Sequence, residues 1–590
     1  MPILLRRHLC VALYAAATLG GCAPHGAPAV VSPMASKRIE GRGGMVAASH
    51  ADAAAAGAEM LRSGGNAIDA FAATAFALSV TDISQTGLGG GGAMTYYNAG
   101  TKRAEHLSFY PRSGASPAWG QQDSVTLRTP PGRIAAVPGM VAGILDAHTK
   151  WGKLTRAQVM APAIRLARDG FIVSPLLSRT ITASRARLIT DSLAAVRFLP
   201  RGEPLRPGEL LVQPELAATL DAIARDGAPA FYTGAIAQAL SAKVKSLGGL
   251  IEVSDLAAYP VLPMRPLCAA WHGFTVLGAP PPMGGAAVLE MLQIADAAGM
   301  STAEGFTDQP SAVTRLADVM RLGNADANRW RGDPTSLRVP ARGVSQQGFA
   351  AQRATLVGGA MADTVVAGDP NAFETTAGPS ACAALDPYPA ASVIEPVPSG
   401  HESSAAPLDL ANTSFTSHLS VIDADGNAVS ATTTVGVLFG SGVYTGGFFL
   451  NSAAANFDAK TRGPNRYSNS TMSPTLILDG SKVKLVIGAA GSQYIQPAIL
   501  QVTMRMLAFG EDPGNAITAP RIHASPNTRE VEVEPGFTGG VYAALIARGY
   551  RPVSRVADIS FGGVHAVFVR KDGMRIGVAD PRRDGVAVRQ

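Results

Sequence analysis

The sequence predicts an α/β (α+β) protein, helix-rich up to about residue 330 and strand-rich from Thr416 to the end. Three observations predict this class. Apolar residues recur at helical spacing in several segments of the first part. Strand-like runs joined by Asp-Gly turns fill the second part. Hydrophobic residues make up 47% and charged residues 16% of the 590 residues, which is typical of a globular protein with a large core.

The helix-rich part begins with an alanine-rich segment. Residues 51–81 carry apolar side chains at helical spacing, and the interruption at Ser63-Gly64-Gly65-Asn66 predicts a helical hairpin. A glycine-rich segment then leads into a strand at Ala93–Tyr97. Further helices are predicted within 138–174 (two, divided at Trp151-Gly152-Lys153), within 215–259, and at Ala286–Ala297 and Ala312–Arg329.

Gly87, Gly89 and Gly92 match the G-x-G-x-x-G pattern of nucleotide-binding loops. That pattern requires a strand before it and a helix after it, and here the order is reversed. We therefore expect these glycines to let the backbone pack closely against another backbone or a ligand. The sequence predicts no bound cofactor.

The strand-rich part follows an unusual segment. Residues 359–415 are rich in Pro, Ala and Ser without periodicity, which predicts a flexible linker. From Thr416 onward, hairpin turns are predicted at Asp425-Gly426, Asp479-Gly480 and Asp572-Gly573, and helices at Ile495–Leu507 and Gly540–Arg548.

The N-terminus resembles an export signal. In residues 1–21, basic residues precede a short apolar run and then small residues. The sequence "LGGC", ending at Cys22, resembles a bacterial lipobox, so Cys22 is the expected lipidation site and residues 22–44 are the expected tether. Ordinary cleavage near Cys22 is the alternative. We expect a periplasmic protein that reaches the membrane only through this lipid anchor.

Charge and cysteine content narrow the possible partners. The net charge of +6 is spread without a Lys/Arg run, so nucleic acid is an unexpected partner. After Cys22, only Cys268 and Cys382 remain, outside any metal-ligand pattern. They can form one disulfide or stay as two buried thiols, and we predict no metal site.

The hairpin that starts at Thr416 carries the candidate chemistry. Hydroxyl and imidazole side chains alternate with apolar ones on both strands, and the register predicted by the turn places Thr434 opposite Thr416, with their hydroxyls in hydrogen-bond reach. A threonine hydroxyl needs a base, and the α-amine of Thr416 can serve once the Phe415–Thr416 bond is cut. The alternative is an ordinary solvent-exposed strand face.

Several motifs, in order along the chain from Met45, resemble those of the γ-glutamyltransferase (γ-glutamyltranspeptidase) family. They include "GLGGGGAMTYYN", "PPPMGG", "TSHLSVIDADGNAVS", "MSPT" and "DPRRDG". The resemblance implies an N-terminal-nucleophile hydrolase fold, a four-layer αββα sandwich autocleaved into a large subunit (residues 45–358, followed by the linker) and a small subunit (residues 416–590). These subunits and a small-molecule amide substrate are the expected partners.

The resemblance also implies residue roles. Thr416 matches the nucleophile and Thr434 the threonine that positions it. Gly491 and Ser492 match the pair of glycines that helps to form the oxyanion hole, so the second glycine is replaced here. Ser470 and Thr471 match the pair that holds the substrate carboxylate.

Departures from the family pattern lie in the substrate pocket. Tyr110 stands where glutathione-using relatives carry an arginine, and Arg112, two positions on, is the candidate replacement. Ala455 and Asn456 replace an Asp pair that receives the α-amino group, and Gly436 replaces a substrate-binding Asn.

The resemblance therefore implies an enzyme that cleaves γ-glutamyl amides such as glutathione through an acyl-enzyme and passes the acyl group to water or an amine. Two alternatives remain open. One is an acylase of the same family acting on another side-chain amide. The other is a non-catalytic exported binding protein.

Overall fold

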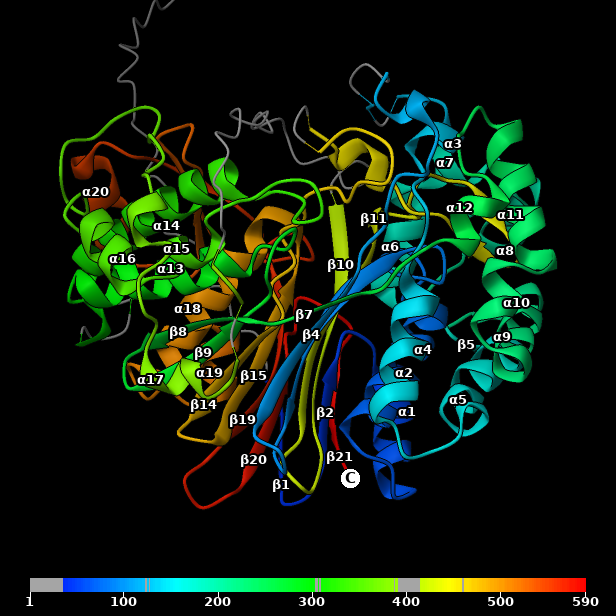
Figure 1. The fold of residues 1–590 in the computed structure, drawn as a ribbon, viewed down its shortest axis with the longest axis horizontal. Helices are drawn as coiled ribbons and strands as arrows, with labels where there is room; N and C mark the ends of the chain where they lie inside the picture. The colour runs from blue at the N-terminus through cyan, green and yellow to red at the C-terminus, as the bar shows by residue number, and fades with distance from the viewer. Residues whose placement is uncertain are drawn as a thin grey trace, which may run out of the picture. The chain divides into compact units, whose positions relative to one another are not determined.

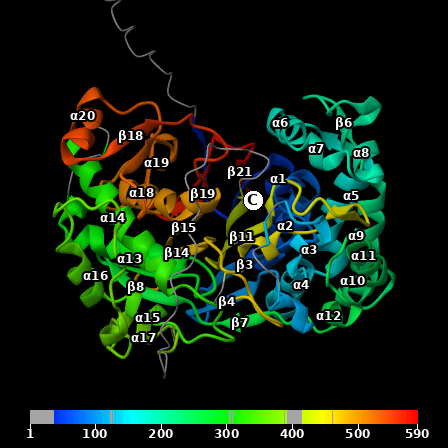
Figure 2. The same cartoon turned by 90° about the horizontal axis from the view of Figure 1, so that it is seen from above.

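The computed structural model describes residues 36–121, 125–126, 128–302, 306, 309–386, 388–390, 414–458 and 461–590. Two seven-stranded sheets lie face to face, and helices cover the outer face of each (Figure 1). The fold is therefore the four-layer αββα sandwich that the family resemblance implies. Figure 2 shows the same layers from above, with the two sheets between the helices.

Both sheets are antiparallel throughout. The first has the order β21 (Val586–Arg589), β2 (Met45–Ala48), β10 (Ser414–Ile422), β11 (Ala428–Val437), β3 (Gly91–Asn98), β4 (Arg103–Phe109) and β7 (Leu262–Met264). The second has the order β1 (Lys37–Gly41), β20 (Arg575–Ala579), β19 (Gly563–Val569), β15 (Lys482–Ala490), β14 (Thr475–Asp479), β9 (Phe274–Gly278) and β8 (Leu267–Trp271). Each sheet contains strands from both sides of Thr416 that pair with one another, so a cut there leaves the pieces joined by backbone hydrogen bonds.

The helices form two groups. Beside the first sheet lie α1 (Ala51–Arg62), α2 (Ala67–Thr81), α3 (Pro131–Ile134), α4 (Met140–Trp151), α5 (Arg156–Asp169), α6 (Pro175–Ala183), α7 (Arg185–Leu188), α8 (Ser192–Phe198), α9 (Pro214–Asp226), α10 (Ala228–Tyr232), α11 (Ala235–Ser246) and α12 (Val253–Ala257). Beside the second lie α13 (Gly285–Ala297), α14 (Pro310–Trp330), α15 (Ala341–Val344), α16 (Gln347–Ala354), α17 (Ser380–Ala383), α18 (Ile495–Leu507), α19 (Pro513–Thr518) and α20 (Gly539–Arg548). The predicted helices and hairpin turns are confirmed.

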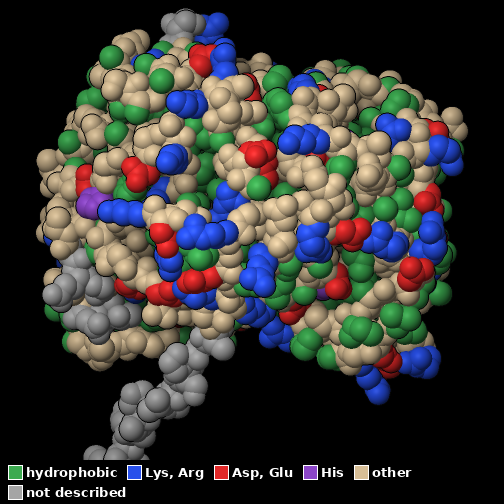
Figure 3. All heavy atoms as spheres, turned by 90° about the horizontal axis from the view of Figure 1, so that it is seen from below, with side chains coloured by type: hydrophobic (Ala, Val, Ile, Leu, Met, Phe, Trp, Pro, Cys, Tyr) green, Lys and Arg blue, Asp and Glu red, His purple; other side chains and the backbone are tan. Residues whose placement is uncertain are grey.

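Short strands complete the structure: β5 (Phe171–Ile172) with β6 (Leu210–Leu211), β12 (Tyr444–Thr445) with β13 (Phe448–Phe449), and β16 (Ile522–Ala524), β17 (Glu530–Val533) and β18 (Arg551–Ser554). No helix in the described ranges is long and apolar enough to cross a membrane. On the face shown in Figure 3, Lys and Arg side chains are interspersed with Asp and Glu.

The α1–α2 hairpin is held by small residues and a polar cap. Every residue of α2 is buried, so its alanines let neighbouring elements approach closely. A Cβ on Gly57 of α1 would lie 2.2 Å from Thr74 Oγ1 of α2, so only glycine fits this crossing. Asn66 and Asp69 form a capping box that fixes the start of α2.

The glycine loop before β3 also packs closely against neighbouring backbone. A Cβ on Gly89 would lie 2.3 Å from the Phe449 carbonyl oxygen, and one on Gly92 would lie 2.5 Å from that of Thr432. The expected close packing is confirmed for Gly89 and Gly92, which allow two backbones to meet. It is wrong for Gly87, where a Cβ would meet only the Val435 side chain, at 3.8 Å.

Polar side chains fill the space between the sheets. Ser420 of β10 donates a hydrogen bond to the His565 carbonyl of β19, at 3.0 Å, and Ser430 of β11 donates to that of Ile487 of β15, at 2.9 Å. His418 lies among them with no exposed surface. The alternative of a solvent-exposed strand face is therefore wrong, because the second sheet covers it.

The described residues of the expected tether (22–44) and of the expected linker (359–415) make specific contacts with the rest of the fold. Lys37–Gly41, the end of the expected tether, forms β1 and pairs with β20. The first part of the expected linker is packed: Arg321 donates hydrogen bonds to the Ala362 and Asp363 carbonyls, and Trp330 donates to that of Gly368. The prediction rested on the absence of a periodic apolar face. The segment is nevertheless packed, because its backbone carbonyls accept hydrogen bonds from side chains elsewhere in the chain. Residues 391–413 and Cys22 lie outside the described residues.

Cys268 of β8 and Cys382 of α17 form a disulfide, which decides between the two open alternatives. The bond ties the packed part of the expected linker to the edge strand of the second sheet.

Candidate active site

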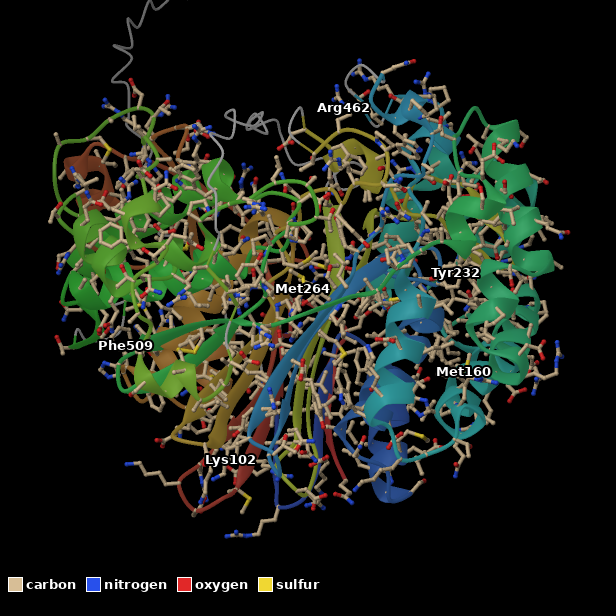
Figure 4. All side chains as sticks on the ribbon, in the orientation of Figure 1. Lys102, Met160, Tyr232, Met264, Arg462 and Phe509 are labelled. Carbon is tan, nitrogen blue, oxygen red and sulfur yellow. A yellow bond between two sulfur atoms is a disulfide. The ribbon has the colours of Figure 1, made fainter. Side chains whose placement is uncertain are left out.

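A cavity of about 640 Å³ opens beside the start of β10. It is lined by residues of β10, β11, α14, α18 and β16 and by loops between the elements. Its lining includes most of the predicted site residues: Tyr110, Thr416, Thr434, Gly436, Asn456, Ser470, Thr471 and Ser492. Figure 4 shows Arg462, another lining residue, at the end of the molecule where β10 begins.

Thr416 of β10 faces a β-bulge on β11. The register pairs Phe415 with Gly436 and Ser417 with Thr433, so one extra residue on β11 faces this part of β10. The Thr416 side chain is buried at 5% exposure, and its Oγ1 accepts a hydrogen bond from the Gly491 N–H at 3.1 Å. The bulge turns this hydroxyl into the cavity.

Thr434 is one of the two bulge residues of β11 that face Thr416, and the predicted register is confirmed for the pairs from Ser417 to Ile422. Its hydroxyl donates to the Phe415 carbonyl oxygen at 2.6 Å and accepts from the Gly436 N–H at 2.7 Å. In the uncleaved chain the Thr434 hydroxyl therefore bonds to the Phe415 carbonyl, and no hydrogen bond to the Thr416 hydroxyl is found among the described residues. That carbonyl belongs to the bond expected to be cut.

Gly491 and Ser492 form the turn between β15 and the 3₁₀ helix Ser492–Tyr494. Gly491 has φ of +130°, and a Cβ there would lie 2.9 Å from the Gly562 backbone, so glycine is required. Ser492 has φ of +53°, in the left-handed region. This region is open to a short polar side chain at a cost of about 1–2 kcal/mol, which explains how serine replaces glycine here.

The substrate residues predicted from the resemblance form one group on the opposite wall. Tyr110 Oη accepts a hydrogen bond from Asn456 Nδ2 at 3.1 Å, and burial raises the pKa of Tyr110, so the phenol stays neutral. Ser470 Oγ accepts from the Met472 N–H at 3.2 Å. These contacts close the cavity around a polar patch.

Gly436 is required by its backbone. Its φ is +93°, and a Cβ would lie 2.1 Å from Ser452 Oγ. No side chain can reach the substrate from this position, so the family's asparagine has no counterpart in the wall at residue 436.

Arg112 does not take the place predicted for it. Its backbone bridges Val137 and Tyr467, and its guanidinium lies over the Tyr467 ring, 5.8 Å from the centroid. It is not part of the cavity lining. Pro111 breaks the regular strand geometry after β4, so the period-two argument does not extend to Arg112.

Two charged groups near the site were missed from the sequence. Asp82, at the end of α2, accepts hydrogen bonds from Ser417 Oγ and, at 2.5 Å, from Gln85 Nε2. Burial raises the pKa of Asp82 to about 7, and Ser417 and Arg583 oppose the rise. The sequence did contain a signal for this group, since Asp82 directly follows the apolar helix α2 and is therefore expected to be buried.

The second missed group is Arg331, which directly follows α14 and lines the cavity. Its sequence neighbours, in "RWRGDP", suggested only a helix end.

Comparisons with known proteins agree with this site. Residues 53–589 match the family described as Gamma-glutamyltranspeptidase. The chain is 31% identical over 568 residues to the glutathione hydrolase proenzyme of Bacillus subtilis, covering 93% of this chain and 92% of that protein. It is 32% identical over 574 residues to the acylase ACY 1 proenzyme of a Pseudomonas species, covering 94% of each.

Among solved structures, cephalosporin acylase from Bacillus halodurans has a TM-score of 0.80 at 25% identity, over 96% of this chain and 99% of that one. The family match spans nearly the whole chain, and the relatives named as proenzymes cover it at similar identity. The chain belongs to the γ-glutamyltranspeptidase family.

Proposed function

We propose that this chain is the precursor of an N-terminal threonine enzyme that cuts its own Phe415–Thr416 bond and then cleaves side-chain amides through an acyl-enzyme on Thr416. The observation that carries the proposal is the hydrogen bond from Thr434 to the Phe415 carbonyl, at 2.6 Å. A donor at this oxygen stabilises the negative charge that forms when the carbonyl carbon is attacked.

In the first reaction, Thr416 Oγ attacks the Phe415 carbonyl carbon and the C–N bond breaks. The nitrogen takes a proton and becomes the α-amine of Thr416, while Phe415 becomes an ester on the hydroxyl. Water then hydrolyses this ester, leaving a carboxylate on Phe415 and a free hydroxyl on Thr416. Thr416 is then the first residue of the small subunit.

In the second reaction the new α-amine is the base. A terminal amine titrates near pH 7.7–8.0, so it is partly neutral at physiological pH and can take the hydroxyl proton. Thr416 attacks the substrate amide, the amine leaves with a proton, and water or a second amine removes the acyl group. The Gly491 N–H, which contacts Thr416 Oγ1, and the Ser492 N–H are the proposed oxyanion donors.

The leading donor class is a γ-glutamyl amide such as glutathione, which the glutathione hydrolase relatives support. An acylase acting on a side-chain amide without an α-amino group is the second candidate. It is favoured by Asn456, which is neutral and bound to Tyr110. The carboxylate of Asp458 also lines the cavity, but it accepts from the Thr461 N–H and Asn469 Nδ2.

The test is electrophoresis and N-terminal sequencing of the purified protein. Wild type is expected to run as two pieces, one beginning at Thr416, whereas Thr416→Ala stays as one chain and Thr434→Ala is cut more slowly. Thr433→Val is the matched control, since Thr433 bonds to Thr86 rather than to Phe415. An unbroken wild-type chain would refute the proposal and favour a binding protein.

We also propose export to the periplasm with a lipid anchor on Cys22. The Cys268–Cys382 disulfide supports an oxidising compartment. Mass spectrometry of the mature N-terminus is expected to show an acylated Cys22, and an unmodified N-terminus downstream of it would contradict the anchor.

A further inference from the structure

One face of the end of α14 forms part of the cavity wall. Asn324, Ala327, Asn328 and Arg331 all line the cavity. Their spacing of i, i+3, i+4 and i+7 places them on one side of the last two helical turns. Arg331 is the residue at which α14 ends, so its long side chain extends from this face.

Arg331 has no partner for its charge. Its guanidinium forms neither a hydrogen bond nor an ion pair with any residue in the described ranges, and its Nε is buried without an acceptor. Burial lowers the pKa of Arg331, while Asp458 and Tyr110 raise it. An arginine stays protonated in proteins, so this wall holds a cation with no anion in direct contact among the described residues.

The neighbouring carboxylate of Asp458 acts on this cation without a hydrogen bond or ion pair between the two groups. Asp458 Oδ1 accepts from the Thr461 N–H and hydroxyl, both at 2.9 Å, and Oδ2 accepts from Asn469 at 3.0 Å. The Asp458 carboxylate therefore stabilises its own loop.

Arg331 acts at the end of the cavity where the family pattern expects an arginine. Tyr110 occupies that position, and the positive charge of Arg331 acts on the Tyr110 phenol. Tyr110 in turn contacts Asn456, and Ser470 lines the same cavity. A cation thus reaches the same polar patch from α14 instead of from the end of β4.

We propose that Arg331 is the specificity-determining residue that binds a carboxylate on the acyl group of the substrate, replacing the arginine absent at Tyr110. This deepens the proposed function and rests on it. It holds for a γ-glutamyl and for a glutaryl donor, since both acyl groups carry a carboxylate. A planar guanidinium can hold that carboxylate through two parallel hydrogen bonds.

The test compares glutaryl-p-nitroanilide with its neutral carboxamide analogue, in which the carboxylate is replaced by an amide of the same shape. Arg331→Met is expected to lower kcat/KM for the charged substrate by at least about 30-fold, mostly through KM, the loss typical of removing one partner of a buried charge pair. The neutral analogue should change less than about twofold, as for an interaction that involves the carboxylate alone.

Two further variants make the comparison specific. Arg331→Lys keeps the charge and should recover part of the preference for the charged substrate. Arg329→Met removes an arginine two positions away, which lies over the Trp330 ring and outside the cavity lining, and should leave both rates unchanged. Equal losses on both substrates, or no loss on either, would overturn the proposal. A two-band gel shows that each variant has folded and processed.

A binding measurement separates this proposal from the proposed function. Glutarate is expected to raise the melting temperature of the wild-type protein and to leave that of Arg331→Met unchanged. If the wild type cleaves neither anilide yet shows this difference, the proposed activity fails and the carboxylate site stands. A shift of equal size in both proteins would overturn the site.

Discussion

The carboxylate of Asp82 accepts a hydrogen bond from the hydroxyl of Ser417, the residue that follows the candidate nucleophile. Arg583 donates to Gln85, which bonds the other Asp82 oxygen, and to the Thr416 carbonyl at 3.3 Å. A buried carboxyl group and a buried guanidinium therefore hold the Ser417 side chain and the Thr416 carbonyl, both on the C-terminal side of the candidate nucleophile.

The first prediction concerns Asp82 and pH. Burial raises the pKa of Asp82 from 3.8 to about 7. Between these values the folded chain keeps a proton that the unfolded chain has lost, so this group lowers stability as pH rises, by about 4 kcal/mol at most. Asp82→Asn removes this dependence.

Urea unfolding at pH 5 and pH 8 measures the effect, with Thr416→Ala as background so that every chain is unbroken. The stability difference between Asp82→Asn and its background should shift in favour of the variant as pH rises. If the stability difference between Asp82→Asn and its background did not change with pH, the raised pKa of Asp82 would be contradicted.

The second prediction concerns acid stability of the polar layer between the sheets. Burial lowers the pKa of His565 from 6.5 to about 3. Stability from this neutral imidazole is complete above pH 6.5 and is lost as pH falls below it, by about 2 kcal/mol at pH 5. His565→Asn should flatten this slope in urea unfolding, whereas the surface control His272→Asn should not. If the free energy of unfolding changed with pH equally in His565→Asn and wild type, the lowered pKa of His565 would be contradicted.

The third prediction concerns the disulfide. Cys268 and Cys382 both precede Thr416, so their bond does not join the two proposed subunits. Reducing and non-reducing gels should therefore show the same two pieces. Cys382→Ser should lower the free energy of unfolding by about 5 kcal/mol in the chain-entropy model for a loop closed across 114 positions. An unfolding free energy of Cys382→Ser equal to that of wild type would argue against a stabilising bond between Cys268 and Cys382.

The fourth prediction concerns Gly436. Its N–H donates to Thr434 Oγ1, and its φ of +93° and the nearby Ser452 exclude a side chain. Gly436→Ala should displace Thr434 and slow autocleavage, measured as precursor remaining over time on a gel. The control is Gly87→Ala, where a Cβ would meet only Val435 at 3.8 Å. Equal processing of both variants would argue against this role.

Local patterns predicted the elements well and the site in part. The period-two hairpin with its Asp-Gly turn was enough to predict the register from Ser417 to Ile422 and so to bring Thr434 beside Thr416, but not the bulge between Phe415 and Ser417. The same reasoning failed for Arg112, because Pro111 ends the regular strand and sequence spacing no longer reports direction.

The linker prediction failed for a related reason. Residues 359–386 carry no periodic apolar face, but they are held by hydrogen bonds from Arg321, Trp330 and Arg353 to their carbonyls. Side-chain donors far away in the sequence give no signal within the segment itself.

The sequence by itself determined the helices, the strands and the hairpin that carries Thr416, because periodicity and turn residues act over a few positions. Tertiary structure alone decided that Thr434 bonds the Phe415 carbonyl, that Asp82 lies beside Ser417, and that Arg331 enters the cavity. These contacts join elements tens to hundreds of residues apart, and only the packing of the two sheets and their helices brings such groups within reach.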